Sequence, residues 1–152
     1  MLRLSKKADY ALMAMKHLAL RGDQGSSSAR EIAAMYDIPI ELMAKVLQRL
    51  VRRGLLASHQ GTRGGYELVR RPTQISVADV IQAIDGPVTV TACSTDENHC
   101  EQYAKCNVRD PLWKVRERII SALGDCTIAE LAADPAPVPA PTTKPAVFHT
   151  HQ

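Results

Sequence analysis

Three of the four cysteines lie close together in the second half of the chain. Cys93, Cys100 and Cys106 follow the pattern C-x6-C-x5-C. Thiolates bind soft metal centres, and iron–sulfur clusters accept such ligands. Structural zinc sites also use cysteine, but they usually contain a closer pair, and no C-x-x-C pair occurs here. The spacing therefore favours an iron–sulfur cluster, either 2Fe–2S or 4Fe–4S, with zinc, a thiol switch or no site as the alternatives.

The composition indicates the compartment and the class of protein in which these thiols would act. The chain has 152 residues, of which 45% are hydrophobic and only 4% aromatic, so an aliphatic core is expected. No apolar run approaches the roughly 20 residues that span a bilayer, and no signal-peptide pattern opens the chain. A cytoplasmic protein without membrane contact is expected, in which structural disulfides are uncommon. Because no nucleophile–base constellation is visible, we expect no enzyme; an iron–sulfur electron carrier is the rival from another class.

The positive charge of the protein is concentrated ahead of the cysteines. Residues 1–85 contain 13 Lys and Arg against 8 Asp and Glu, whereas residues 86–152 contain 6 against 8. Within residues 45–71, seven basic side chains accompany one acid, Glu67. This concentration fits a polyanionic partner such as DNA, although a solvated basic face would have the same charge.

Hydrophobic periodicity indicates the elements that position these charges. Apolar residues recur at helical spacing in three successive segments, residues 5–21, 29–36 and 40–53. Ser28 and Glu31 fit a capping box at the start of the second helix. Two short apolar segments flank a glycine-rich turn at residues 61–65, which predicts a β-hairpin. This order predicts a mainly α fold, a winged helix-turn-helix with a two-stranded wing.

The helix predicted over residues 40–53 has the layout of a DNA recognition helix. Its apolar stripe would face the core, while the opposite stripe presents long polar side chains to base edges. Arginine and glycine in the hairpin would approach phosphates or the minor groove. The residues expected to contact DNA are Ser28, Glu41, Lys45, Gln48, Arg49, Arg52, Gln60, Thr62, Arg63 and Gly64.

The remainder of the chain contains further helix signals. Ser76 is expected to start a helix that ends at Gly86, and Asp110 is expected to be the N-cap of a long helix. A short helix follows that long one. The predicted division is a DNA-binding domain at 1–85, a cysteine-containing loop at 86–109, a helical segment at 110–133 and a disordered Pro/Ala-rich tail at 134–152.

Three groups of residues occur together in this chain. They are Leu2-Arg3-Leu4-Ser5 with Asp9-Tyr10-Ala11-Leu12, the wing Gly61-Thr62-Arg63-Gly64-Gly65-Tyr66, and Cys93, Cys100 and Cys106 followed by Leu112-Trp113. Their combination resembles the IscR-type family of iron–sulfur winged-helix transcription regulators, over about residues 1–132. The opening and the wing are most similar to the branch that regulates the SUF iron–sulfur assembly operon.

The resemblance implies a fold, a partner and a cofactor. It implies a homodimer that pairs through the long C-terminal helix, about residues 111–123, and binds a double-stranded DNA operator. It implies a cluster held by Cys93, Cys100 and Cys106, whose loss changes DNA affinity. The segment at 110–133 is then a dimerisation helix with a short terminal helix. The position of the Glu that tunes sequence choice in IscR is Ala44 here, so a different operator preference is expected.

The fourth cluster ligand differs from the IscR pattern. In IscR-type members it is a His three residues after the last cysteine, and this chain has Arg109 at that position. In nitric-oxide-sensing relatives it is an Asp on the first helix of the partner subunit, and Asp9 matches that position. The resemblance therefore makes Asp9 the candidate fourth ligand.

Overall fold

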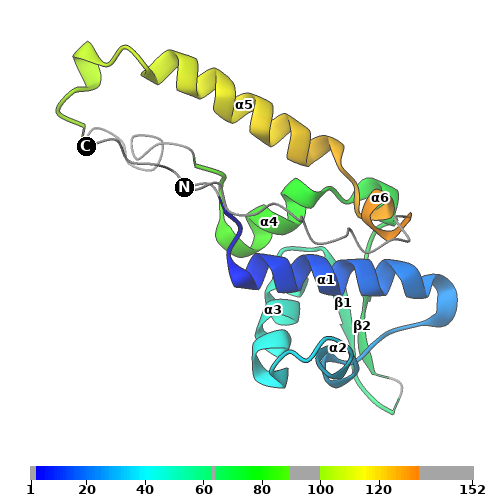
Figure 1. Ribbon diagram of the computed structural model, residues 1–152. Coiled ribbons are helices and arrows are strands. Elements are labelled where there is room, and N and C mark those ends of the chain that lie inside the picture. The colour runs from blue at the N-terminus through cyan, green and yellow to red at the C-terminus, as the bar shows by residue number, and fades with distance from the viewer. Residues whose placement is uncertain (1–2, 63, 90–99, 134–152) are drawn as a thin grey trace, which may run out of the picture.

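The computed structural model describes residues 3–62, 64–89 and 100–133 (Figure 1). The helices and strands, in chain order, are α1 (Lys6–Arg21), η1 (Gly22–Gln24), α2 (Ala29–Met35), α3 (Ile40–Arg52), β1 (Leu56–His59), β2 (Gly65–Leu68), η2 (Pro72–Gln74), α4 (Val77–Asp85), η4 (Tyr103–Lys105), α5 (Arg109–Asp125) and α6 (Ile128–Ala133). The predicted winged helix-turn-helix is confirmed. Arg63, Cys93 and the tail at 134–152 lie outside the described residues.

Local capping explains where most helices begin. Ser28 and Ser76 each accept the backbone N–H three residues on, and Glu31 and Asp79 complete two capping boxes. The expected cap of α5 is wrong, because this helix begins at Arg109 and Asp110 lies in its first turn. The Asp110 carboxylate instead accepts a hydrogen bond from Arg109 Nε at 3.2 Å, which draws it away from the backbone.

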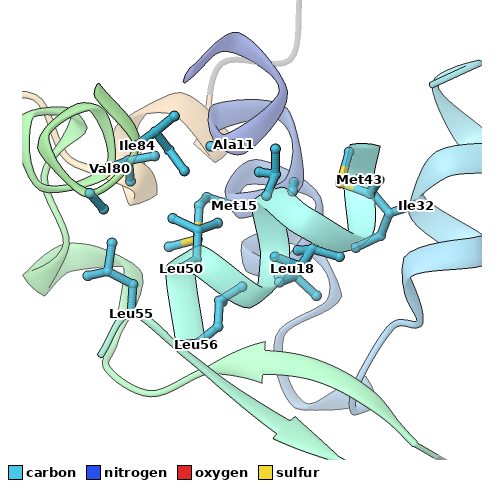
Figure 2. Packing of buried hydrophobic residues seen from close by; sticks show 14 of the residues in the cluster. Ala11, Met15, Leu18, Ile32, Met43, Leu50, Leu55, Leu56, Val80 and Ile84 are labelled. Carbon is cyan, nitrogen blue, oxygen red and sulfur yellow. The ribbon is translucent and has the colours of Figure 1, made fainter. Parts of the chain in front are cut away.

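The core lies between α1, α2, α3 and α4 and is closed below by β1 (Figure 2). Met15, Ile32, Met43 and Leu50 are completely buried within it. Each comes from a different helix or a different turn, so the apolar stripes of the helices meet in one cluster. The core is therefore aliphatic, as the low aromatic content predicts.

The wing is attached to the segment that precedes α2. β1 and β2 pair antiparallel, with Leu56 opposite Leu68 and His59 opposite Gly65. Ser27 extends this pairing, because its N–H donates to the Tyr66 carbonyl at 3.1 Å and its carbonyl accepts from Tyr66 N–H at 2.8 Å. The base of the wing is thus fixed to the start of the helix-turn-helix.

The long helix α5 packs on α4 and leaves most of its surface uncovered. It runs along one side of the molecule, above α4 and away from α3 and the wing (Figure 1). Along α5, which is described throughout, no residue is buried, and Trp113 and Val115 are 53% and 42% exposed. These two side chains are two positions apart, so they project from different sides of α5 as separate exposed apolar groups. In the part of the chain that the structure describes, no helix is long and apolar enough to cross a membrane.

Candidate nucleic-acid interface and cysteine segment

The two faces of α3 differ as the sequence predicts. Met43, Val46, Leu47 and Leu50 are buried against the other helices. The polar stripe consists of four exposed side chains, Glu41, Lys45, Gln48 and Arg52. Because the apolar face holds the helix on the core, the polar face is presented outward at a fixed orientation.

A shallow basic hollow lies beside this stripe. Its volume is about 480 Å³, and its polar lining comes from Lys7, Lys45, Gln48, Arg49 and Arg52. The floor is apolar, formed by Leu42, Val46 and Ile84. Four cationic side chains around one hollow raise the local potential toward anions such as DNA phosphates. Sequence reasoning missed Lys7, since only the packing of α1 on α3 brings it to this place.

Arg49 differs from its neighbours on α3 because it already has a partner in the protein. Its Nε donates to the backbone carbonyl of Ala83 in α4 at 2.9 Å. This contact crosses between two helices, and the sequence spacing of the two residues gave no sign of it. Among the residues expected to contact DNA, Arg49 therefore also joins α3 to α4.

The tip of the wing presents small polar groups. Gln60 and Thr62 are exposed, and Gly64 is half-buried with its N–H donating to the Gly61 carbonyl at 2.9 Å. Behind the tip, His59 Nε2 and Glu67 Oε1 lie 2.6 Å apart across the two strands. This side-chain contact was not foreseen, because the hairpin register had to be known before the two side chains could be matched.

Ser28 is committed to capping α2. Its Oγ accepts from Glu31 N–H at 3.1 Å, and its own N–H donates to Glu31 Oε2 at 3.3 Å. Only the hydroxyl hydrogen of Ser28 then remains to donate to a phosphate. A phosphate that approached the Ser28 N–H would compete with the Glu31 carboxylate for this donor.

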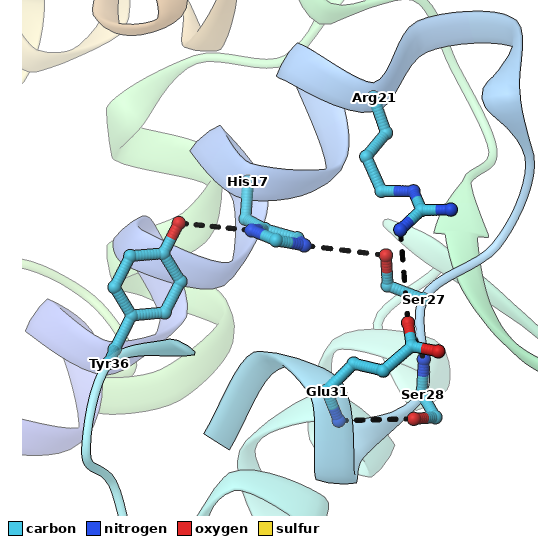
Figure 3. A network of polar contacts seen from close by, with 6 residues as sticks. All are labelled: His17, Arg21, Ser27, Ser28, Glu31 and Tyr36. Carbon is cyan, nitrogen blue, oxygen red and sulfur yellow. Dashed lines mark hydrogen bonds and ion pairs between the residues drawn. The ribbon is translucent and has the colours of Figure 1, made fainter. Parts of the chain in front are cut away.

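A polar network links α1 to the segments on both sides of α2 (Figure 3). His17 Nδ1 lies 3.0 Å from the Tyr36 hydroxyl, and its Nε2 lies 3.4 Å from the buried Ser27 hydroxyl. Burial lowers the pKa of His17, and the nearby Arg21 guanidinium lowers it further, while Glu31 opposes this shift. The neutral imidazole therefore connects both partners near neutral pH.

His17→Gln is expected to flatten the acid side of the pH–stability profile. Because the folded-state pKa of His17 lies below 6.5, the unfolded chain binds more protons as the pH falls through that value. The stabilisation from neutral His17 is thus complete above pH 6.5 and is lost progressively below it. Urea unfolding between about pH 8 and pH 5 should show a steeper loss for the wild type than for the variant. Parallel profiles would show that His17 contributes no such linkage.

Two of the three clustered cysteines are described, and both are free thiols: Cys100 lies three residues before η4 and Cys106 directly follows it. Cys100 is exposed, and its carbonyl accepts from Tyr103 N–H at 3.1 Å; Cys106 is half-buried and ends the turn. Arg109 lies over the Tyr103 ring, 4.3 Å from its centroid, and donates to the Tyr103 carbonyl at 3.1 Å. The hydrogen bond to Asp110 raises the pKa of Arg109, so this guanidinium stays protonated and has no lone pair for a metal.

Asp9 is not brought to Cys100 or Cys106 within one chain. It lies half-buried in the first turn of α1, while η4 lies beyond the far end of α5 (Figure 1). Among the residues that the structure describes, no three His, Cys, Asp or Glu side chains are grouped to hold a metal ion. Cys126 lies outside this segment, directly after α5. Its carbonyl accepts a hydrogen bond from Val77 N–H at 2.8 Å, and burial raises the pKa of its thiol.

The fold and the exposed face of α3 define this protein as a winged-helix DNA-binding regulator. Residues 4–134 match the model of the Rrf2 family, described as iron-dependent transcriptional regulators. The chain belongs to the Rrf2 family. Its relatives are transcriptional regulators rather than enzymes, in agreement with the absence of a catalytic constellation in the sequence.

Individual relatives agree with this assignment. The chain is 35% identical to the HTH-type transcriptional regulator IscR of Xenorhabdus nematophila over 131 residues, which cover 86% of this chain and 79% of that protein. Its structure is similar to that of CymR, the global cysteine regulator of B. subtilis, with a TM-score of 0.72, 26% identity and coverage of 87% and 97% of the two chains. It is also similar to IscR of T. potens, with a TM-score of 0.67, 27% identity and coverage of 86% and 85%.

Proposed function

We propose that this protein is a homodimeric DNA-binding regulator that senses iron–sulfur or redox status through its cysteine segment. DNA binding is supported mainly by the exposed polar stripe of α3, which lies beside the wing while the opposite, apolar face of the helix is buried in the core. Lys7, Lys45 and Arg52 of the adjacent hollow would neutralise phosphates and place the stripe in a major groove. The cytoplasm is the proposed location.

The remaining contacts to DNA would come from the other expected positions. Glu41, Lys45, Gln48 and Arg52 would read base edges or phosphates, and Ser28 would donate to a phosphate. Gln60, Thr62 and Gly64 would meet the backbone or the minor groove, together with Arg63. The wing keeps its orientation through its backbone bonds to Ser27, so helix and wing act as one rigid surface.

The donors in the cysteine segment fit an iron–sulfur cluster. Cys100 and Cys106 are free thiols, one before and one after the short helix η4, and thiolates are the ligands that such clusters prefer. Cys93 would be the third ligand. A bound cluster would tie these residues together and so restrict the segment between α4 and α5.

The uncovered face of α5 supports the homodimer. Pairing of two α5 helices would bury one of the two apolar side chains that are largely exposed in a single chain, Trp113 or Val115, since these project from different sides of the helix. Because Asp9 does not meet Cys100 or Cys106 within one chain, Asp9 of the partner subunit would be the ligand that completes the cluster. The proposed targets are iron–sulfur assembly (SUF) genes, on the resemblance of the opening and wing residues.

Lys45→Ala tests the DNA-binding surface. The probe is a duplex of about 30 base pairs that the wild type selects from a random-sequence library. Removing a basic side chain from the polar stripe should weaken DNA binding about tenfold. The slope of the logarithm of the binding constant against the logarithm of the salt concentration should become about one smaller in magnitude. Lys114→Ala, an exposed lysine on α5, is the matched control and should bind as the wild type does. Equal binding by the two variants would contradict a DNA contact through α3.

A further inference from the structure

At the carboxyl end of α4, the backbone carbonyl of Ala83 lacks a partner within the helix. The carbonyl of Ala83 would accept from the N–H of residue 87, but residue 87 is Pro and has no N–H. The preceding carbonyl, that of Gln82, is satisfied by Gly86 N–H at 3.0 Å. An unpaired carbonyl beside the buried Ala83 side chain would be costly, so a donor from elsewhere is needed.

Arg49 of α3 supplies that donor. Its Nε lies 2.9 Å from the Ala83 carbonyl, in a partly buried contact 34 residues apart in sequence. A hydrogen bond from a charged group is stronger than a neutral one, and a cation at a helix carboxyl end also complements the helix dipole. The link between α3 and α4 is therefore a directed polar contact as well as apolar packing.

The same end of α4 is held from two other sides. Ser5 Oγ donates to Asp85 Oδ1 at 2.6 Å, and Ser5 N–H lies 3.3 Å from Asp85 Oδ2, which ties α1 to this end. Arg116 Nε of α5 donates to the Val88 carbonyl at 3.1 Å. Residues 83–88, which we name the α4 junction, thus contact α1, α3 and α5, and the cysteine segment begins within them.

We infer that Arg49 is a positioning residue, which sets the orientation of the recognition helix α3 on the α4 junction rather than reading a base or a phosphate itself. The inference rests on the proposed DNA-binding function and names a means of regulating it. A displacement of the junction by the cysteine segment would reach α3 through this hydrogen bond in addition to the apolar packing between α3 and α4. The rotation of α3 would then alter every base contact that its polar stripe makes.

Arg49→Met tests this role, because it keeps an apolar stem but removes the donor. The probes are the duplex selected by the wild type, a scrambled duplex of equal length, and a panel with single base-pair changes in the selected site. The variant should bind the selected duplex about tenfold more weakly. Its discrimination should fall at several base pairs of the panel, and its loss of binding to the scrambled duplex should be smaller than its loss on the selected duplex.

Other outcomes would overturn the inference. Loss of discrimination at a single base pair would make Arg49 a base contact. Equal losses on selected and scrambled duplexes, with a smaller salt dependence, would make it a phosphate contact. Unchanged binding would exclude both roles. If the wild type selected no sequence at all, the proposed function itself would fail, which is a separate result.

Two further variants separate the loss of the Arg49 hydrogen bond from the loss of its charge. Arg52→Met removes the same charge from the same hollow. It should lose discrimination at a single base pair or lose affinity equally for the selected and scrambled duplexes, rather than lose discrimination at several base pairs. Arg49→Lys retains the charge but has no donor at the position of Nε, so its binding to the scrambled duplex should stay as in the wild type while any loss is spread over several base pairs of the panel; a loss at a single base pair in this variant would contradict the inference. Circular dichroism of each variant establishes that it is folded, and Arg49→Lys serves alone if Arg49→Met does not fold.

Discussion

Gly65→Ala is expected to lower the free energy of unfolding by about 3 kcal/mol. A Cβ at this position would lie 2.6 Å from both the carbonyl carbon and the oxygen of Ser27, and 2.9 Å from Ser28 N. These atoms are backbone, so they yield only if the chain moves, and the two hydrogen bonds between Ser27 and Tyr66 would then be strained or broken. The φ of +156° at Gly65 adds to the cost.

The readout is thermal or urea unfolding of the purified protein. A loss of this size lowers the melting temperature by roughly 10 °C in a chain of this length. Gly124→Ala is the matched control, because this glycine lies in α5 with nothing within 4 Å of an added Cβ. That control should be neutral or more stable by up to about 1 kcal/mol. Equal stability of both variants would mean that the contact between wing and α2 segment is looser than described.

Cys100→Ala is expected to abolish cluster binding in protein purified without oxygen. The wild type should be brown and contain iron and sulfide, because three thiolates from one segment suit an iron–sulfur cluster. Loss of one ligand leaves two cysteines, which should retain little or no iron. The measurements are visible absorption together with iron, sulfide and zinc analysis of each preparation.

Cys126→Ala is the matched control for this variant. Cys126 lies between α5 and α6, where its carbonyl is bonded to α4, and not in the cysteine segment. Its replacement should leave the iron and sulfide content unchanged. Zinc in place of iron in the wild type would support the alternative of a zinc-containing regulator, and a colourless, metal-free wild type would support a thiol switch.

Local patterns in the sequence were sufficient for most of the fold. The Ser28–Glu31 capping box, the helix-turn-helix and the glycine-rich hairpin each depend on residues close in sequence, and the structure confirms all three. The start of α5 was misplaced because Asp110 had a competing neighbour, Arg109, whose side chain takes its carboxylate. Capping preferences alone do not weigh such a side-chain pair.

The site was less accessible to sequence reasoning. The exposed stripe of α3 follows from helical periodicity, and it lies where the sequence predicts. The Arg49 contact with Ala83 and the placement of Lys7 depend on how α4 and α1 pack against α3. The fourth ligand could not be placed in the same way, since Asp9 does not meet Cys100 or Cys106 within a single chain and its proposed role depends on a second subunit.

The central claim is that the state of the cysteine segment sets DNA affinity. The most direct measurement compares cluster-loaded wild type with Cys100→Ala for binding to the duplex that the wild type selects, without oxygen and at one salt concentration. The account predicts affinities that differ about tenfold or more, because the two states would hold the α3 helices differently. Equal affinities, with iron and sulfide present only in the wild type, would contradict it.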